Sequence, residues 1–219
     1  MHHNVAVAID PARLLFNGVP SLLAMAIDVL KIQPGHRVLH LGTGLGYYTA
    51  IIANCVGPTG RVLGIEVDAD LAVGARSNLA DRRWVEVRHG NGAEPFDETF
   101  DAILINAGVT HPLTGWMDAL APDGRIILPL TATMPAMTTI GKGPMLLMNK
   151  TGHTKWTARV VGFVAIYSAL ELRDDERNTL LGQALTQAPL APITSARLES
   201  HDPSPSCWLH TPGFCLSLE

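Results

Sequence analysis

The sequence predicts an α/β fold whose centre is a doubly wound, mostly parallel sheet. Short apolar runs alternate with helical patterns between residues 20 and 130, as in chains whose parallel strands are joined by helical crossovers. The run at residues 37–41 does not alternate between polar and apolar faces, which is typical of a strand buried on both sides. Around residue 150 two strands follow each other directly, so we expect the sheet to end with an antiparallel strand.

Each predicted element has a recognisable start or end. The first helix opens at Pro20, a residue suited to a helix start, and Pro34-Gly35 ends it. Gly57-Pro58 closes the second helix. The predicted helices span residues 20–31, 48–56, 70–81, 112–120 and 171–187. The predicted strands span residues 37–41, 61–67, 84–89, 100–106, 125–130, 145–149 and 156–169, followed by a proline-interrupted loop at 188–193 and a hairpin at 207–218.

The composition is that of an ordinary globular chain. Its 219 residues are 47% hydrophobic and 16% charged, and we expect a main domain at residues 1–170 with a helix and hairpin extension, 171–219, packed on it. A net charge of −4 offers no basic surface for a nucleic-acid partner. Three scattered cysteines do not indicate a disulfide framework, and no apolar run reaches the length of a membrane span. We therefore expect a cytoplasmic protein without a membrane partner.

The clearest functional signal is the glycine turn VLHLGTGLGYYTA at residues 38–50. Glycines at 42, 44 and 46 follow the first predicted strand and precede a helix. A dinucleotide site requires G-x-G-x-x-G, but its third glycine is replaced here by Tyr47. Glycines let a ligand approach the backbone, and the amides that open the helix near Tyr47 can receive a carboxylate. This spacing favours a ligand that joins a nucleoside to an amino acid, such as S-adenosylmethionine.

Two polar residues follow the next strands at the same predicted sheet edge. Glu66 ends the second strand, where a carboxylate can accept both ribose hydroxyls of a nucleoside. Asn91 lies between two glycines after the third strand, and its amide can bond the edge of an adenine. Alone, each is an ordinary feature, because strand-end glutamates are usually solvated and Asn-Gly is a common turn. Together at one edge they favour a nucleoside pocket.

The segments VLHLGTGLGYYTAIIA, GIEVD, GNG, FDAILINAGVTHP and LAPDGRIILPL, in this order, resemble a class I S-adenosylmethionine-dependent methyltransferase. More closely, residues 16–168 are similar to the protein-L-isoaspartate O-methyltransferase family. The resemblance implies a Rossmann-like sheet of about seven strands, the last threaded one antiparallel, and S-adenosylmethionine as the cofactor. It implies that the cofactor site is lined by Gly42, Thr43, Gly44, Gly46, Glu66 and Asn91, to which we add their neighbours His40, Tyr47, Val67 and Gly92 as candidates.

The chain departs from that family at three places. His40 stands where the family has Asp or Glu, and a neutral imidazole brings no charge to the ligand's ammonium group, so we expect weaker cofactor binding. Gly18 replaces a Ser or Thr hydroxyl that shapes the family's substrate carboxylate site. The N-terminal segment is short, and residues from about 170 onward are extra or divergent. They are predicted to supply the missing cover, another substrate pocket or a dimer surface.

The loop after the fourth strand faces the methyl group in such folds. Asn106 is the candidate for orienting the methyl acceptor, and His111 is either a base or a structural residue before Pro112. The acceptor itself is left open between a small molecule and a peptide, with a carboxylate or another oxygen or nitrogen nucleophile. The alternative function is a non-catalytic binding or assembly protein of the same fold, because His40 and Gly18 replace functional residues. A nicotinamide oxidoreductase is disfavoured by Tyr47.

The C-terminal hairpin raises the question of a metal. Cys207, His210 and Cys215 are metal-ligating residue types, but their spacing fits no standard zinc pattern. Small, apolar cysteines in the core of a hairpin explain them better, so we expect no metal site. The simpler expectation for this hairpin is that it packs on its own sheet. It could also pair with a second copy of the chain, so a homodimer is among the possible partners.

Overall fold

The computed structural model describes residues 4–134, 136–152, 156–187 and 192–219. Its centre is an eleven-stranded sheet whose two halves have different strand directions. The parallel half has the order β5 (Val85–His89), β4 (Arg61–Glu66), β3 (Arg37–Leu41), β6 (Phe100–Ile105) and β7 (Leu120–Pro129). The antiparallel half continues with β9 (Met137–Lys150), β10 (Trp156–Tyr167), β11 (Ser195–Arg197), β13 (Phe214–Ser217) and β12 (Cys207–Thr211), and β8 (Ala132–Met134) pairs with β9.

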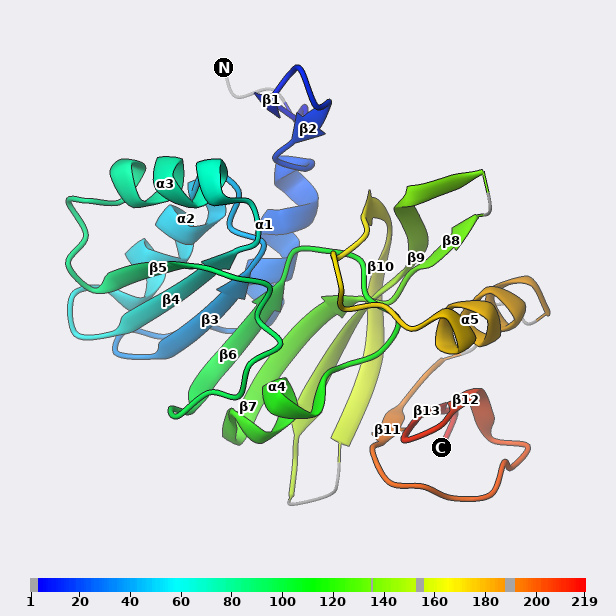
Figure 1. The fold of residues 1–219 in the computed structure, drawn as a ribbon. Coiled ribbons are helices and arrows are strands. Elements are labelled where there is room, and N and C mark those ends of the chain that lie inside the picture. Colours follow the sequence, from blue (N-terminus) through cyan, green and yellow to red (C-terminus); the bar gives the residue numbers. More distant parts are fainter. Residues whose placement is uncertain (1–3, 135, 153–155, 188–191) are drawn as a thin grey trace.

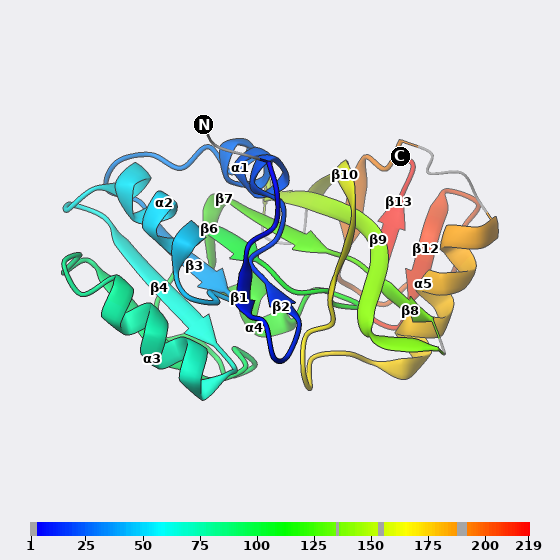
Figure 2. The same ribbon diagram turned by 90° about the horizontal axis from the view of Figure 1, so that it is seen from above.

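Helices cover both faces of the sheet (Figures 1 and 2). Helices α1 (Pro20–Val29) and α2 (Tyr47–Val56) pack on one face of the parallel strands, and α3 (Ala69–Asn78) packs beside β5. The short α4 (Thr114–Asp118) and α5 (Asp175–Gln187) contribute to the larger core on the other face. The sheet is therefore buried on both sides, which explains why its central strands lack an alternating pattern. Among the described residues, no helix is both long and apolar enough to cross a membrane.

The predicted order of elements holds, but four boundaries were wrong. The helix expected at 112–120 is only α4, and the helix expected from residue 171 begins at Asp175, where Asp174 Oδ1 accepts the Arg177 amide at 2.8 Å. Strand β7 starts five residues earlier than predicted, at Leu120, and β9 starts at Met137 instead of residue 145. Of the loop predicted at 188–193, residues 188–191 lie outside the described residues.

The antiparallel half also differs in detail from the expectation. The strand that opposes the parallel block is β9, and β10 runs antiparallel to β9 in turn. The C-terminal residues do not form a separate layer, because β11 pairs with β10 and extends the sheet to β13 and β12. Two elements lie apart from this sheet: β1 (Ala8–Asp10) and β2 (Leu15–Phe16) form a small N-terminal hairpin.

Candidate functional site

The candidate residues gather where the parallel strands end. A cavity of ≈ 50 Å³ opens at the carboxyl edge of β3, β4 and β6, the usual ligand edge of a doubly wound sheet. Its lining includes Leu41, Gly42, Ile65, Val67, Asn91 and Trp116.

The glycine turn adopts a backbone that other residues would strain. Gly42, Gly44 and Gly46 have φ angles of 78°, 55° and 90°, in the left-handed region. A Cβ atom on Gly42 would lie 3.0 Å from the Asn106 carbonyl oxygen, and one on Gly46 would lie 2.8 Å from Leu79 Cδ1. The turn therefore leads directly into the first amides of α2, and glycines are needed there because of both the φ angles and the nearby protein atoms.

Glu66 is the buried carboxylate of the site. Its side chain is 6% exposed and accepts hydrogen bonds from the amides of Gly44 at 2.7 Å and Asp68 at 3.1 Å. Burial raises the pKa of this carboxyl, and the two amides oppose that shift. Each carboxylate oxygen can accept more than one hydrogen bond, so the group is held in place and can still accept from hydroxyls.

Asn91 and its neighbours form the adjacent part of the edge. Asn91 Nδ2 donates to Glu171 Oε2 at 3.2 Å, and its Oδ1 accepts the Ala93 amide at 3.0 Å. Gly92 has a φ of 75°, and a Cβ atom there would lie 1.9 Å from Leu41 Cδ2. The Gly92 carbonyl accepts Trp116 Nε1 at 2.8 Å, which fixes the indole under the cavity.

A linker between β10 and α5, residues 168–174, covers this cavity. Its residues Ala169, Leu170 and Leu172 complete the lining, and Figure 1 shows it crossing the ends of the parallel strands. Arg173 anchors the linker by donating to the carbonyls of Gly108 at 2.7 Å and Thr131 at 2.6 Å. The cavity is small because the linker is closed over it.

The sequence of the chain matches a known family over the strands and the glycine turn of the site. A sequence model described as "Protein-L-isoaspartate(D-aspartate) O-methyltransferase (PCMT)" matches residues 14–160, more than half of the 219 residues. The chain belongs to this family.

Individual relatives agree with the family assignment. The protein-L-isoaspartate O-methyltransferase of Methanopyrus kandleri is 35% identical over 116 residues, 51% of this chain and 51% of that protein. A solved protein-L-isoaspartate O-methyltransferase gives a TM-score of 0.65 at 21% identity, over 89% of this chain and 59% of the other. A beta-aspartate methyltransferase from Plasmodium falciparum, solved in complex with S-adenosyl-L-homocysteine, gives 0.56 at 18% identity, over 75% and 76%.

These likenesses confirm the predicted class I methyltransferase fold. The chain spans about half the length of the curated relatives it matches.

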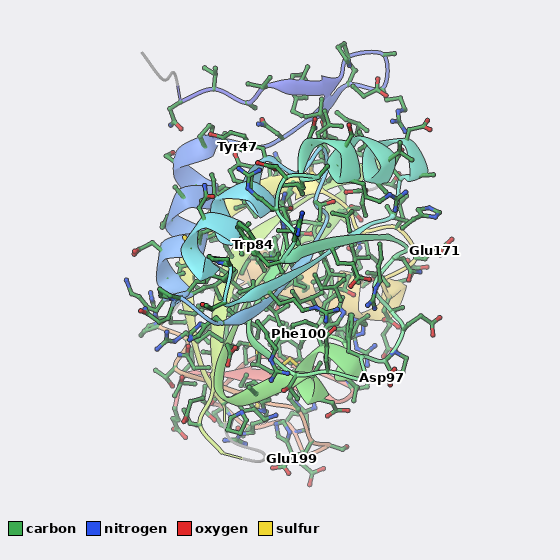
Figure 3. All side chains as sticks on the ribbon, turned by 90° about the vertical axis from the view of Figure 1, so that its left-hand side faces the viewer. Tyr47, Trp84, Asp97, Phe100, Glu171 and Glu199 are labelled. Atoms are coloured by element: carbon green, nitrogen blue, oxygen red, sulfur yellow. The ribbon has the colours of Figure 1, made fainter. Side chains whose placement is uncertain are left out.

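Two further candidate cofactor residues, Thr43 and Tyr47, lie around the turn without lining the cavity. Thr43 is 3% exposed, and its Oγ1 donates to the Gly44 carbonyl at 3.4 Å. Tyr47 is 53% exposed at the start of α2, with its ring edge-on to Tyr48. Figure 3 shows Tyr47 at the edge of the molecule that carries the N-terminal hairpin. The Thr43 amide donates to the Ile65 carbonyl at 3.3 Å.

His40 does not face the cavity. It is fully buried on the opposite side of β3, where its Nδ1 bonds Thr49 Oγ1 at 2.9 Å. Its Nε2 has no hydrogen-bond partner among the described residues, and burial lowers its pKa to about 3. The structure therefore does not support the prediction that His40 contacts the cofactor. The replacement of the family's acidic residue is instead accommodated in the core under α2.

The two catalytic candidates have structural partners. Asn106 Nδ2 donates to the Gly42 carbonyl at 3.3 Å, so this side chain braces the glycine turn. His111 bonds Thr110 Oγ1 at 2.9 Å and lies against Arg177, outside the cavity lining. Burial, reinforced by the Arg177 charge, lowers the pKa of His111 to about 4. The structure does not support His111 as the base of a methyltransferase.

The N-terminal hairpin is the part of the site that sequence reasoning missed. Ile9 of β1 lies 3.3 Å from the position of a Cβ on Gly44. Arg13 forms ion pairs with Asp68, the N-cap of α3, and with Asp10, and it lowers the pKa of both carboxyls. The short N-terminal segment thus already covers the glycine turn. No motif marks it, because its partner for the ion pair that holds it on α3, Asp68, lies far from Arg13 in the sequence.

Proposed function

We propose that the chain is an S-adenosylmethionine-dependent methyltransferase of the isoaspartyl type. The observation that carries the proposal is the grouping at one sheet edge of Gly42 and Asn91, which line the cavity, with Glu66, which holds the glycine turn through the Gly44 amide. The donor set fits the group. Glu66 would accept the ribose hydroxyls, the first amides of α2 would receive the methionine carboxylate, and Asn91 would bond the adenine edge. When bound, the cofactor supplies a methyl group on a sulfonium, and the chain positions the acceptor and excludes water.

The lining of the cavity favours a carboxylate acceptor. Among the described residues, those that line it are apolar side chains, glycines and Asn91, with no titratable base. An ionised carboxylate attacks a sulfonium methyl without a base, whereas a neutral hydroxyl or amine has a proton to lose. We therefore place carboxylate-bearing peptides and small molecules before other oxygen or nitrogen nucleophiles.

Gly18 bears on which carboxylate is accepted. Its φ is 81°, and a Cβ there would lie 3.1 Å from Leu23 Cδ2, so a serine could not be restored without strain. The sequence lacks the family's hydroxyl at this position, and the backbone conformation also disfavours any residue that could carry one. This supports an acceptor whose recognition differs in detail from that of the family's isoaspartyl peptides.

The alternative is a binding or assembly protein of the same fold. The contact between Glu171 and Asn91 supports it, because a residue of the linker already bonds the amide that an adenine would use. We further propose that the chain divides into a main domain at residues 1–170 and an extension at residues 171–219. The three free cysteines support a cytoplasmic location. We also propose that the chain forms a homodimer, which light scattering of the full chain tests.

Calorimetric titration of S-adenosylhomocysteine into the full chain tests the cofactor assignment, with NAD as the control ligand. We expect binding of the first alone. Glu66→Gln should weaken it about 10-fold or more, since hydrogen bonds to charged groups contribute ~1.5–3 kcal/mol. Glu199→Gln, on a distant loop (Figure 3), is the matched control and should bind as wild type. Equal binding by Glu66→Gln and wild type would contradict the site.

Transfer of a radiolabelled methyl group to an isoaspartyl peptide, to a normal aspartyl peptide and to small dicarboxylates tests the activity. We expect labelling of at least one carboxylate as a base-labile ester. Cofactor binding without transfer to any acceptor would favour the binding protein over the enzyme.

A further inference from the structure

Four metal-ligating side chains meet at the C-terminal hairpin. The ligand atoms of His201, Cys207, His210 and Cys215 all lie within 4.8 Å of one another. The hairpin lies at the end of the sheet opposite β5, and it is distant from the glycine turn in both Figures 1 and 2. Neither the family assignment nor the proposed methyl transfer uses this cluster.

A β-bulge brings Cys207 and His210 to the same face of β12. Residues three apart on a regular strand point to opposite faces. Here Cys207 pairs with Ser217 and Leu209 with Leu216, so Trp208 is an extra residue and the register shifts by one. Cys215 lies directly opposite His210 on β13 and therefore shares its face. The other face carries the core residues Trp208, Leu209, Phe214 and Leu216.

His201 comes from the loop before β12 and completes the set. Its Nε2 lies 3.6 Å from Cys207 Sγ, and its ring is edge-on to His210 with centroids 4.8 Å apart. Its Nδ1 lies 3.1 Å from the Glu199 carbonyl, an acceptor that holds the proton on Nδ1 and leaves the Nε2 lone pair toward the sulfur. Metal-bound histidines usually have such a second hydrogen bond.

The polar atoms of the cluster are incompletely satisfied by the protein. His210 Nδ1 is buried and has no hydrogen-bond partner among the described residues. The amide of Ser204 donates to Cys207 Sγ at 3.5 Å, and the Ser204 hydroxyl lies 3.4 Å from the same sulfur. A thiolate, the form in which cysteine binds metals, accepts such hydrogen bonds.

We propose that His201, Cys207, His210 and Cys215 form a structural zinc site. Two thiolates and two imidazoles are a ligand set typical of zinc. Tetrahedral bonds of ~2.0–2.3 Å separate ligand atoms by roughly 3.3–3.8 Å, so the cluster reaches this geometry by small side-chain rotations. Four protein ligands leave no open position, and the site therefore joins the loop at 198–206 to the hairpin and takes no part in catalysis.

Zinc content of the full chain tests the proposal, measured by elemental mass spectrometry after ZnCl₂ reconstitution under reducing conditions and desalting. We expect about one zinc per chain, as for a closed four-ligand site. Cys207→Ser and Cys215→Ser should lose it. Cys55→Ser, which removes the cysteine outside the cluster, is the matched control and should retain it.

His201→Gln guards against unfolding of the cysteine variants, because its half-buried side chain lies in a loop. It should keep the wild-type circular dichroism but release zinc to a chelator at a lower concentration. Cobalt-loaded wild type should show the visible absorption of tetrahedral thiolate coordination. The proposal is overturned if reconstituted wild type holds far less than one zinc or if Cys207→Ser holds as much as Cys55→Ser. It is also overturned if the fully reduced, cobalt-loaded protein gives no thiolate–cobalt spectrum.

Discussion

The two ends of the sheet place their functional residues in different ways. At the parallel end, Gly42, Glu66 and Asn91 follow successive strands, and their order in the sequence already predicts their proximity. At the antiparallel end, Cys207 and His210 share a face only because Trp208 bulges out of the register. A parallel sheet aligns its strand ends by construction, whereas a hairpin face depends on a single inserted residue. The order of residues in the sequence therefore predicts which of them lie together at the first end. At the second end, that grouping follows only from the structure.

Metal removal should give the largest difference between the two ends of the sheet, because it should destabilise only the antiparallel end. A chelator that strips zinc should destabilise the hairpin, by an amount on the order of several kcal/mol, because binding energy at a structural zinc site is folding energy. Hydrogen exchange should increase at residues 207–217, while the affinity for S-adenosylhomocysteine stays within about twofold. An equal loss of cofactor affinity would show that the two ends are coupled.

A single methyl group should disturb the parallel end. Gly92→Ala combines a φ of 75° with a Cβ 1.9 Å from Leu41 Cδ2, so we expect a loss of about 2 kcal/mol in the free energy of unfolding. Gly90→Ala is the matched control, because a Cβ there has no atom within 4 Å, and it should change stability by less than ~0.5 kcal/mol. Urea unfolding measures both, and similar losses would contradict the close packing at Gly92.

The buried His40 predicts a pH dependence of stability. Its pKa is about 3 in the folded chain against 6.5 when exposed, so between these values only the unfolded chain takes up the proton. The free energy of unfolding should therefore decrease as pH falls below 6.5, by up to ~1.4 kcal/mol per pH unit for this group. His40→Leu should flatten that slope. Thr49→Val, which keeps the imidazole, should retain it, and an unchanged slope in His40→Leu would refute the assignment.

The smallest effect should come from the exposed ion pairs of the N-terminal hairpin. Arg13→Gln removes the contacts with Asp10 and Asp68, so we expect faster hydrogen exchange at residues 8–16 and little change in the melting temperature. Added salt should reduce the difference from wild type, since it screens the same charges. Unchanged exchange at low salt would mean that Ile9 packing alone holds the hairpin.

The sequence predicted the parallel fold because it follows from local patterns, and the assignment of its carboxyl edge to a cofactor stays a prediction. It missed the start of β9, where Gly141, Gly143 and Pro144 resemble a loop. There a Cβ on Gly143 would lie 2.0 Å from the Leu130 carbonyl oxygen, so the glycine marks a close approach of two segments within a strand. His201 and the contact of Glu171 with Asn91 were missed because both depend on loops whose course no periodicity encodes.

Because Asn91 is hydrogen-bonded to Glu171, the Glu171 side chain competes with any ligand that bonds the Asn91 amide. A ligand that uses the Asn91 amide must exchange places with a carboxylate already tethered next to it, on a residue with a φ of 62°. The dissociation constant measured for that ligand then equals its intrinsic value divided by the fraction of molecules whose linker stands open. The measured affinity for the ligand therefore also depends on how often the contact between Glu171 and Asn91 is broken. Glu171→Gln, which weakens that contact, should raise the affinity although residue 171 does not contact the bound ligand.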